Sequence, residues 1–232
     1  MGPRSADVSA MFSRIARHYD LMNALMTGGL DRAWRRATAR TAVSGTPPGP
    51  VLDLATGTAD VALAIRRADP RRAVIGADFS EGMLHAGAVK LRRRGERRVA
   101  LLAADALALP FADASFAAVT SAFLLRNLED PGRGLREMRR VTMPGGRVVA
   151  LEITPPPDGA WARLFGLYFH RVVPAVGALV AGDRAAYTYL PDSVAAFLRP
   201  DALAELMRAA GLRDVTYTRF GLGTIAIHTG VV

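Results

Sequence analysis

The segment VLDLATGTAD at residues 51–60 constrains the fold more than any other part of the chain. Its first four residues have the character of a buried strand, a turn of small residues follows, and a helical pattern begins at Asp60. Gly57 allows a tight turn and lets the backbone approach a ligand closely. Free N–H groups at the start of the next helix can bind a polar group. The segment therefore predicts a strand–turn–helix unit with a ligand site that includes Ala55 and Gly57.

A second strand pattern indicates the class of ligand. The apolar run 74–77 ends at Asp78, an acid 21 residues after Gly57, and an acid at this spacing can reach the ribose of an adenosine-type cofactor. The first turn holds only Gly57 and lacks the G-x-G-x-x-G pattern, which argues against a dinucleotide. Asp53 would repel a pyrophosphate and suits a cationic ligand such as S-adenosylmethionine. The alternative is an ordinary β-α-β unit without activity.

Composition limits the partners and the location that we expect. The 232 residues suit one α/β domain with an appendage, and because there is no cysteine and the four histidines are scattered, no metal site is expected. The net charge of +9 favours anionic surfaces, but only one of the 30 basic residues is lysine, which indicates biased codon usage. Nothing resembles a nucleic-acid-binding pattern. A secretory signal and a continuous apolar span are both missing, so we expect a cytoplasmic chain.

Strand and helix patterns alternate along most of the chain, which predicts an α/β fold with a doubly wound, mainly parallel sheet. The expected strands are 51–55, 73–77, 99–103, 116–121, 147–153, 215–219 and 224–229. The expected helices of the core are 60–68, 81–94, 131–142 and 201–210. Pro144, Gly145 and Gly146 predict a turn before the fifth strand, and the last two strands predict an antiparallel hairpin.

The same pass along the chain predicts a single domain, residues 1–232. Its expected parts are an N-terminal helical cap (1–45), a cofactor-binding core (51–153), a helical insertion or substrate lid (159–198) and a C-terminal helix with a hairpin (201–232).

Ligands of open α/β sheets bind beyond the carboxyl ends of the strands. At these ends we expect Asp78 to accept from a ribose, Phe79 or Met83 to cover an adenine, and Asp105 to accept from the adenine amine. Asp53 and the first turn would hold the ammonium of a methionine. The alternatives are that Asp78 caps the next helix, that Asp105 caps a turn, and that Phe79 and Met83 belong to the core.

Longer segments carry a more specific pattern. They are HYDLMNALMTGGLDRAWRR (18–36), VLDLATGTAD (51–60), ADFSEGML (77–84), LPFADASF (109–116), FLLRNLEDPGRGLREMRRV (123–141), PGGRVVALE (144–152), AYTYLPDSV (186–194) and GTIAIHTG (223–230). Together they resemble the C-methyltransferases of menaquinone and ubiquinone biosynthesis, class I enzymes that use S-adenosylmethionine. The resemblance covers nearly the whole chain and implies a Rossmann-like, seven-stranded sheet with N-terminal helices and a helical insertion before the last helix and hairpin.

The resemblance also implies roles for individual residues. The cofactor contacts of the family fall on Thr58, Asp78, Asp105, Ala106 and Ser121. The catalytic elements fall on Tyr19, Arg126 and Asn127. The chain departs from the family at Ala59 and Leu124, where glycine is frequent, and the second change reshapes the expected quinone pocket.

The implied acceptor is a prenylated quinol, demethylmenaquinol above all, because a ring carbon needs an adjacent hydroxyl to be nucleophilic. Arginine stays protonated, so we expect Arg126 to stabilise the developing phenolate, with Asn127 and Tyr19 bound to the quinol oxygens. Two alternatives stay open: an ion pair of Arg126 with Glu129 or Asp130, and His18 as a base.

A polyprenyl tail needs an apolar groove, and residues 161–169 with 172–180 behind them are candidates to line it. The alternative is that these residues only pack the insertion on the sheet. The charge and this segment together predict peripheral contact with an anionic membrane on its inner face, and a homodimer is left open. The competing functions are methylation of another apolar phenolic or polyketide metabolite, and a non-enzymatic S-adenosylmethionine-binding module.

Overall fold

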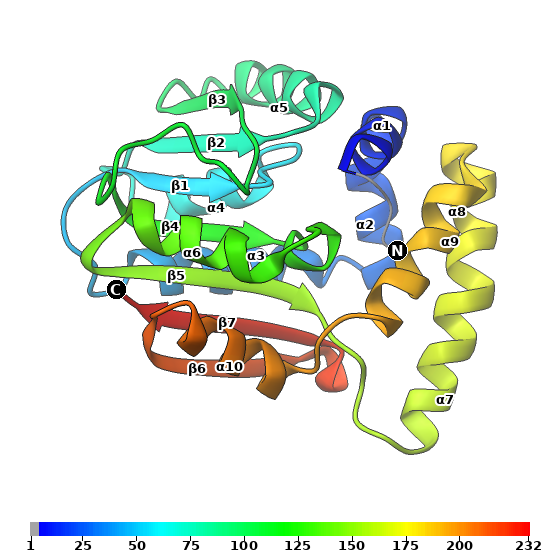
Figure 1. Cartoon of the computed structure of the whole chain (residues 1–232). Helices are drawn as coiled ribbons and strands as arrows, with labels where there is room; N and C mark the ends of the chain where they lie inside the picture. Colours follow the sequence, from blue (N-terminus) through cyan, green and yellow to red (C-terminus); the bar gives the residue numbers. More distant parts are fainter. Residues whose placement is uncertain (1–4) are drawn as a thin grey trace.

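The protein is built on one seven-stranded sheet, seen edge to edge in Figure 1. This computed structural model describes residues 5–232, with only the backbone at residues 5, 6, 181 and 184. The strands are β1 (Val51–Leu54), β2 (Val74–Asp78), β3 (Val99–Ala103), β4 (Phe116–Ala122), β5 (Thr142–Ile153), β6 (Arg213–Phe220) and β7 (Ile225–Val231). Their order is β3-β2-β1-β4-β5-β7-β6, and only β7 runs antiparallel to its neighbours. This arrangement confirms the predicted doubly wound, mainly parallel sheet with a terminal hairpin.

The order of the strands reverses between β1 and β4, whose registers pair Leu54 with Ser121. In sheets of this kind a crevice opens at that point, beyond the carboxyl ends of the strands. The fold therefore locates a ligand site next to the turn that follows β1.

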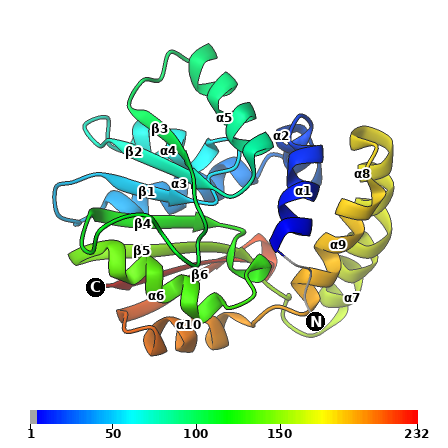
Figure 2. The same ribbon diagram turned by 45° about the horizontal axis from the view of Figure 1, so that its top comes forward.

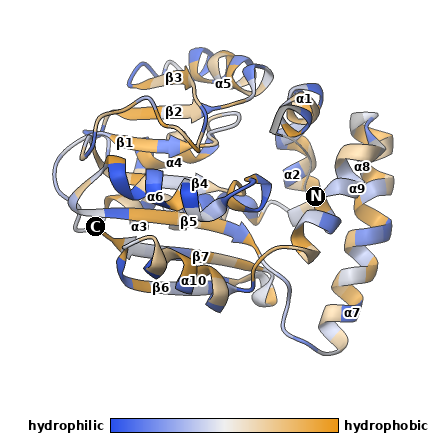
Figure 3. Ribbon diagram, in the orientation of Figure 1, coloured by the Kyte–Doolittle hydropathy of each residue, from blue (hydrophilic) through white to orange (hydrophobic). Residues whose placement is uncertain are grey.

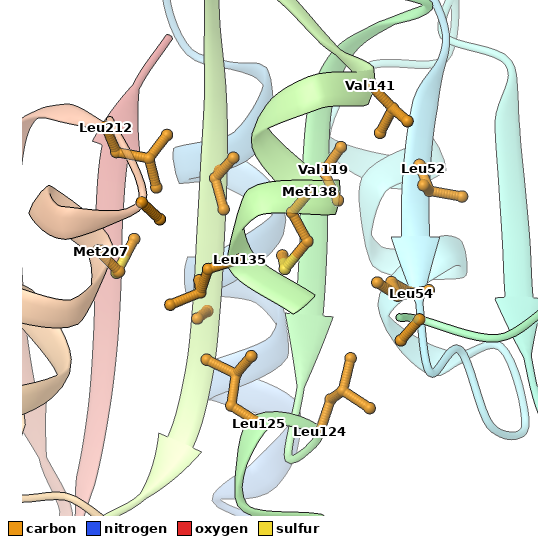
Figure 4. Packing of buried hydrophobic residues seen from close by; sticks show 14 of the residues in the cluster. Leu52, Leu54, Val119, Leu124, Leu125, Leu135, Met138, Val141, Met207 and Leu212 are labelled. Atoms are coloured by element: carbon orange, nitrogen blue, oxygen red, sulfur yellow. The ribbon is translucent and has the colours of Figure 1, made fainter. Parts of the chain in front are cut away.

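Helices cover both faces of the sheet (Figure 1). One face carries α3 (Asp31–Val43), α4 (Asp60–Ala68) and α5 (Glu81–Arg93), and the other carries α6 (Pro131–Val141) and α10 (Pro200–Ala209). Figure 4 shows the second interface, where Leu135 and Met138 of α6 and Met207 of α10 are fully buried against the strands. Both faces of the central strands are apolar, as expected for parallel strands covered on both sides.

The predicted elements agree with the structure to within one or two residues at most ends, and β5 is the exception. It begins at Thr142, so Pro144, Gly145 and Gly146 lie inside the strand and the predicted turn is wrong. Gly145 takes a positive φ of 74°, and a Cβ on Gly146 would lie 2.7 Å from the carbonyl oxygen of Ala117. The two glycines let β5 continue beside β4 across a shift in register. A sequence pattern that favours a turn here produces an irregularity in a strand.

A second group of helices stands at the edge toward which β1, β2, β4 and β5 point (Figures 1 and 2). It comprises α1 (Ser5–Ile15), α2 (Tyr19–Thr27), α7 (Ala160–Leu167), the π-helical turn η2 (Tyr168–Val172), α8 (Val173–Ala181) and α9 (Arg184–Ala195). Buried residues of the N-terminal helices and of the insertion share one core, which includes Met22 of α2, Phe169 of η2 and Val194 of α9. The N-terminal helices and the insertion thus pack together over the carboxyl ends of the strands.

Candidate active site

Two cavities lie between the strand ends and these outer helices. The smaller, about 220 Å³, borders the turns after β1, β2, β3 and β4, and we call it the cofactor cavity. The larger, about 350 Å³, is enclosed by α1, α2, α3, α7, η2 and α9, and we call it the acceptor cavity. Phe12, Tyr19 and Phe123 line both cavities and form the wall between them. Two ligands bound side by side would meet at this wall.

Asp78 is the best-defined polar group of the cofactor cavity. One carboxylate oxygen accepts from the N–H of Gly57 and the other from the N–H of Ser80, both at 2.8 Å. Burial raises the pKa of Asp78, and these hydrogen bonds oppose the shift. Each oxygen keeps a further lone pair for a ribose hydroxyl. The helix cap of α5 is Ser80, whose Oγ accepts from the N–H of Met83 at 3.3 Å, so the alternative that Asp78 caps this helix is wrong.

Other residues predicted for the cofactor line the same cavity. They are Ala55, Gly57, Phe79, Met83, Asp105 and Ala106. Phe79 is 52% exposed and free to cover a flat ring, whereas Met83 is 2% exposed and belongs to the core as well as to the lining. Asp105 serves two purposes: one oxygen accepts from the N–H of Leu107 at 2.8 Å, and the side chain still borders the cavity.

Asp53 lies under the turn and does not line the cavity, so the expected contact with a methionine ammonium is not what the structure provides. Its carboxylate accepts from the hydroxyls of Thr56 and Thr120, each at 2.7 Å, and from the N–H of Ala62 at 3.1 Å. Burial raises the pKa of Asp53 to about 6. Asp53 thereby ties the turn to β4 and to α4, which is a supporting role.

Thr58 does not line the cofactor cavity either. Its hydroxyl belongs to a hydrogen-bond network that joins α2 to the turn after β1. The hydroxyl donates to Asp20 at 2.6 Å and accepts from the ammonium of Lys90 at 2.9 Å. The same ammonium contacts Asp20 at 2.6 Å and Asp60 at 2.8 Å. The only lysine of the chain therefore connects the cofactor turn to the helix that carries Tyr19.

Ser121 is fully buried at the end of β4, and its hydroxyl has no hydrogen-bond partner among the described residues. Its register partner Leu54 and its neighbour Ala122 both line the cofactor cavity. Ser121 itself does not line the cavity, so its expected contact with the cofactor is not what the structure provides. The carboxylates of Asp78 and Asp105, which do line it, fit an adenosine-type cofactor.

The acceptor cavity is mainly aromatic and aliphatic. From the segment proposed to hold a tail, Trp161, Phe165, Tyr168 and Phe169 line it. The prediction is wrong for Leu164 and Leu167, which lie exposed on the outer surface of α7. From the segment expected behind the lining, Val173, Val176 and Val180 pack in one core with the lining residues. Residues three or four apart share one face of a helix, so one face of α7 points inward and the other outward.

Arg126 lines the acceptor cavity, and its partner is an acid that the sequence pattern did not reveal. Its guanidinium lies 3.3 Å from Glu152 and donates to the carbonyl of Phe123 at 2.7 Å. The proposed pair with Glu129 or Asp130 is therefore wrong. Glu152 is 1% exposed at the end of β5, and burial raises its pKa to about 7 although Arg126 lowers it. The one acid in the mainly apolar segment RVVALEI, Glu152, was the sequence signal that could have indicated a buried partner for a cation.

Asn127 lines the cofactor cavity and is held at both ends of its amide. Its Nδ2 donates to the carbonyl of Phe123 at 3.0 Å, and its Oδ1 accepts from the hydroxyl of Tyr189 at 3.0 Å. His18 is exposed and lines neither cavity, which argues against it as a base. Asn23, Tyr187 and Tyr189 also line the acceptor cavity. Their segments carry the family pattern, but a local pattern does not indicate which side chains point inward.

Comparison with known proteins agrees with this geometry. The sequence profile described as the ubiE/COQ5 methyltransferase family matches residues 1–232. A demethylmenaquinone methyltransferase of Thermus thermophilus is 48% identical over 220 residues, which cover 95% of this chain and 99% of that protein. One of Deinococcus radiodurans is 48% identical over 211 residues, with 89% and 85% covered. A ubiquinone/menaquinone biosynthesis C-methyltransferase UbiE of Desulfotalea psychrophila is 45% identical over 225 residues, with 97% and 89% covered.

Solved structures are similar in fold. A crystal structure of the cyclase SpnF aligns with a TM-score of 0.73 at 20% identity, covering 99% of this chain and 97% of that one. A SAM-dependent methyltransferase of Thermotoga maritima aligns with a TM-score of 0.65 at 19% identity, with 96% and 98% covered. One scaffold hosts both a cyclase and a methyltransferase, so the fold alone does not assign a reaction.

Proposed function

The chain belongs to the ubiE/COQ5 methyltransferase family, and from this premise we propose that it methylates a ring carbon of a prenylated quinol with S-adenosylmethionine, forming menaquinol from demethylmenaquinol. The observation that carries the proposal is the pair of cavities that share the wall of Phe12, Tyr19 and Phe123. One is bordered by carboxylates and open turns, and the other is apolar. The two demethylmenaquinone methyltransferases that are 48% identical to the chain support the choice of acceptor.

The cofactor cavity would hold S-adenosylmethionine, which supplies an activated methyl group. Asp78 binds the ribose, Phe79 and Met83 cover the adenine, and Asp105 accepts from its amine. Gly57 and Ala55, which both have a positive φ of 55°, bring the turn against the ligand. These contacts leave the methyl group to be presented toward the shared wall.

The residues around Arg126 provide the chemistry toward the acceptor. The guanidinium stays protonated, orients a water molecule that takes the proton of the quinol hydroxyl, and stabilises the phenolate that remains. The phenolate supplies electron density to the ring carbon that accepts the methyl group. Tyr19, which lines both cavities, hydrogen-bonds a quinol oxygen and orients the ring, and the aromatic lining excludes bulk water. Asn127 lines the cofactor cavity and not the acceptor cavity, so its expected contact with the quinol is replaced by a positioning role, in which its amide holds the hydroxyl of Tyr189. After the transfer, the methylated ring carbon gives up its proton and the ring oxygen regains one, which restores the aromatic quinol with one net proton released.

Peripheral contact with a membrane would deliver the prenyl tail. Leu30 and Leu222 line the acceptor cavity and are 55% and 73% exposed, so its mouth lies at an apolar surface. Leu164 of α7 and Leu179 of α8 are exposed as well, and both of these outer helices carry hydrophobic residues in Figure 3. In the described part of the chain, no helix has the length and apolarity needed to cross a bilayer.

The proposal is tested by incubating the protein with methyl-labelled S-adenosylmethionine and either reduced demethylmenaquinone or a panel of phenols and polyketides. Label on the quinol ring carbon supports the proposal. Label only on a phenol or polyketide assigns the protein to another apolar metabolite, and cofactor binding without any transfer assigns it to a non-enzymatic module. Native mass spectrometry of the same sample measures bound cofactor and tests the homodimer.

Vesicle co-sedimentation tests the membrane contact. Binding should increase with anionic lipid and fall with salt. The change of Leu164 and Leu167 to glutamate should weaken it, while the same change at the exposed Leu102 of β3 should not. Equal binding of both variants would contradict the contact through α7.

A further inference from the structure

Tyr187 of α9 is an unexplained polar group in the acceptor cavity. The residue is 3% exposed and lines the cavity, yet its hydroxyl has no hydrogen-bond partner among the described residues. Proteins rarely bury a hydroxyl in this way, because the group gives up water and receives nothing in return. The hydroxyl is therefore either a defect or a group kept free for a ligand.

The position of the Tyr187 ring is fixed by its packing. A Cβ added to Gly177 of α8 would lie 2.3 Å from the ring, so only glycine allows the ring to lie against this helix. Burial raises the pKa of Tyr187 to about 12, and the neighbouring Tyr19 adds to the shift. The hydroxyl thus stays protonated at neutral pH and is held as a hydrogen-bond donor beside Tyr19.

A second unpaired donor faces the same space. Nδ2 of Asn23, one helical turn after Tyr19 on α2, is buried without a partner among the residues that the structure describes, and Asn23 lines the acceptor cavity. Nε of Arg126 and Nε1 of Trp161 are buried without a described partner as well, and both residues line this cavity. A few fixed donors in a mainly apolar cavity are typical of a site that recognises a flat ring with a few polar atoms.

We infer that Tyr187 and Asn23 donate hydrogen bonds to the ring oxygens of the quinol, and that they thereby select and orient the acceptor. The inference rests on the proposed function and adds two substrate-binding residues to it. Quinone and quinol oxygens both accept hydrogen bonds, so the contact serves the oxidised and the reduced ring.

Tyr168 offers a matched control within the same cavity. It also lines the acceptor cavity, but its hydroxyl donates to the carbonyl of Met26 at 2.9 Å. Replacing Tyr168 by phenylalanine breaks a hydrogen bond of the folded protein, whereas the same change at Tyr187 removes a hydroxyl that has none. Each variant loses the same hydroxyl oxygen, so comparing the two separates a structural role from a ligand-binding role.

The experiment titrates the full chain with 2-prenyl-1,4-naphthoquinone and follows tryptophan fluorescence. The chain has two tryptophans, Trp34 and Trp161, and both line the acceptor cavity, so quenching reports on its occupancy. Tyr187→Phe and Asn23→Leu should each weaken binding roughly tenfold, as expected for the loss of one buried hydrogen bond. Tyr168→Phe should weaken binding several-fold less than Tyr187→Phe does.

Thermal unfolding provides the second readout. Tyr187→Phe should keep or raise the melting temperature, because it removes an unpaired buried group, and Tyr168→Phe should lower it. S-adenosylhomocysteine should bind all variants as it binds the wild type.

Equal naphthoquinone affinity of the wild type and Tyr187→Phe would overturn the inference, and so would a melting temperature of Tyr187→Phe that falls as far as that of Tyr168→Phe. If the wild type binds S-adenosylhomocysteine but does not bind the naphthoquinone, the proposed acceptor itself is wrong.

Discussion

The two cavities differ in how their polar groups are held. In the cofactor cavity, the carboxylate of Asp78 is already hydrogen-bonded by the backbone at the strand ends. In the acceptor cavity, helices supply an apolar lining and leave donors such as Tyr187 and Asn23 unpaired. The sheet thus presents a preformed site for a common cofactor, and the added helices supply the recognition of the acceptor. A change at the strand ends should affect one ligand, and a change on the helices should affect the other.

The largest effect is expected from Arg126→Ala, which should lower the methylation rate about 100- to 1000-fold, the usual cost of removing one electrostatic contact to a transition state. Affinity for S-adenosylmethionine should stay nearly unchanged, because Arg126 lines the acceptor cavity and not the cofactor cavity. Single-turnover methylation of demethylmenaquinol at saturating cofactor measures the rate. Arg126→Lys should remain impaired, since a point charge does not replace the planar guanidinium.

The control for this prediction is Arg136→Ala on α6, whose exposed guanidinium pairs with Asp130 at 3.6 Å. It should methylate at the wild-type rate. A wild-type rate in Arg126→Ala would leave this residue as no more than the ion-pair partner of Glu152.

Asp78→Ala should produce the opposite result, with S-adenosylmethionine affinity 10- to 100-fold weaker through the loss of a charge-assisted hydrogen bond. Naphthoquinone affinity should not change. Calorimetric titration measures the first quantity and tryptophan quenching the second. Glu205→Ala, at an exposed acid of α10, is the control. Unchanged cofactor affinity in folded Asp78→Ala would remove this residue from the site.

The cofactor cavity, built from strand ends, was easier to predict from the sequence than the acceptor cavity, which is built from packed helices. Asp78 and Asp105 were predicted because the register of parallel strands brings their carboxyl ends to one edge. Asp53 was misplaced because alternate residues of a strand face opposite sides, and this acid faces α4, where it binds the N–H of Ala62. Strand periodicity alone does not say which of the two sides the ligand occupies.

The acceptor cavity was harder to predict because its parts are far apart in the chain. Asn23 and Tyr187 are brought together by the packing of helices whose mutual arrangement no local pattern encodes. The partner of Arg126 was missed for the same reason: Glu152 is on β5, 26 residues away, whereas Glu129 and Asp130 are close in sequence. Sequence distance is a poor guide to ion pairing at the ends of a sheet.

Lys90→Met should disturb both cavities, because it removes the ammonium that bridges Asp20 of α2 and Asp60 at the cofactor turn. Tyr19 would then be less well placed, and misplacement of this kind reduces rates strongly. We expect methylation to fall roughly tenfold, or about 1.4 kcal/mol. Arg92→Met, at an exposed position of the same helix, is the control. Equal rates in both variants would show that the network does not couple α2 to the turn.

The smallest functional effect is expected from Glu152→Gln at pH 5, where the wild-type acid is protonated. Burial raises the folded pKa of Glu152 to about 7 from 4.5, so its protonated form is stabilised by folding. This contribution to the free energy of unfolding is present below pH 4.5 and is lost as the pH rises through 7, by about 3 kcal/mol in all. Urea denaturation should show that the free energy of unfolding of the wild type declines from pH 5 to pH 8, and that this decline is smaller in Glu152→Gln. Parallel declines would contradict the raised pKa.

The central claim is that the cavities are separate sites that meet at the wall of Phe12, Tyr19 and Phe123. Its most direct test is to titrate 2-prenyl-1,4-naphthoquinone against the fluorescence of Trp34 and Trp161, with and without saturating S-adenosylhomocysteine. The account predicts a ternary complex, with naphthoquinone affinity equal or tighter when S-adenosylhomocysteine is bound. Displacement of the naphthoquinone by S-adenosylhomocysteine would contradict it, because the two ligands would then compete for one site.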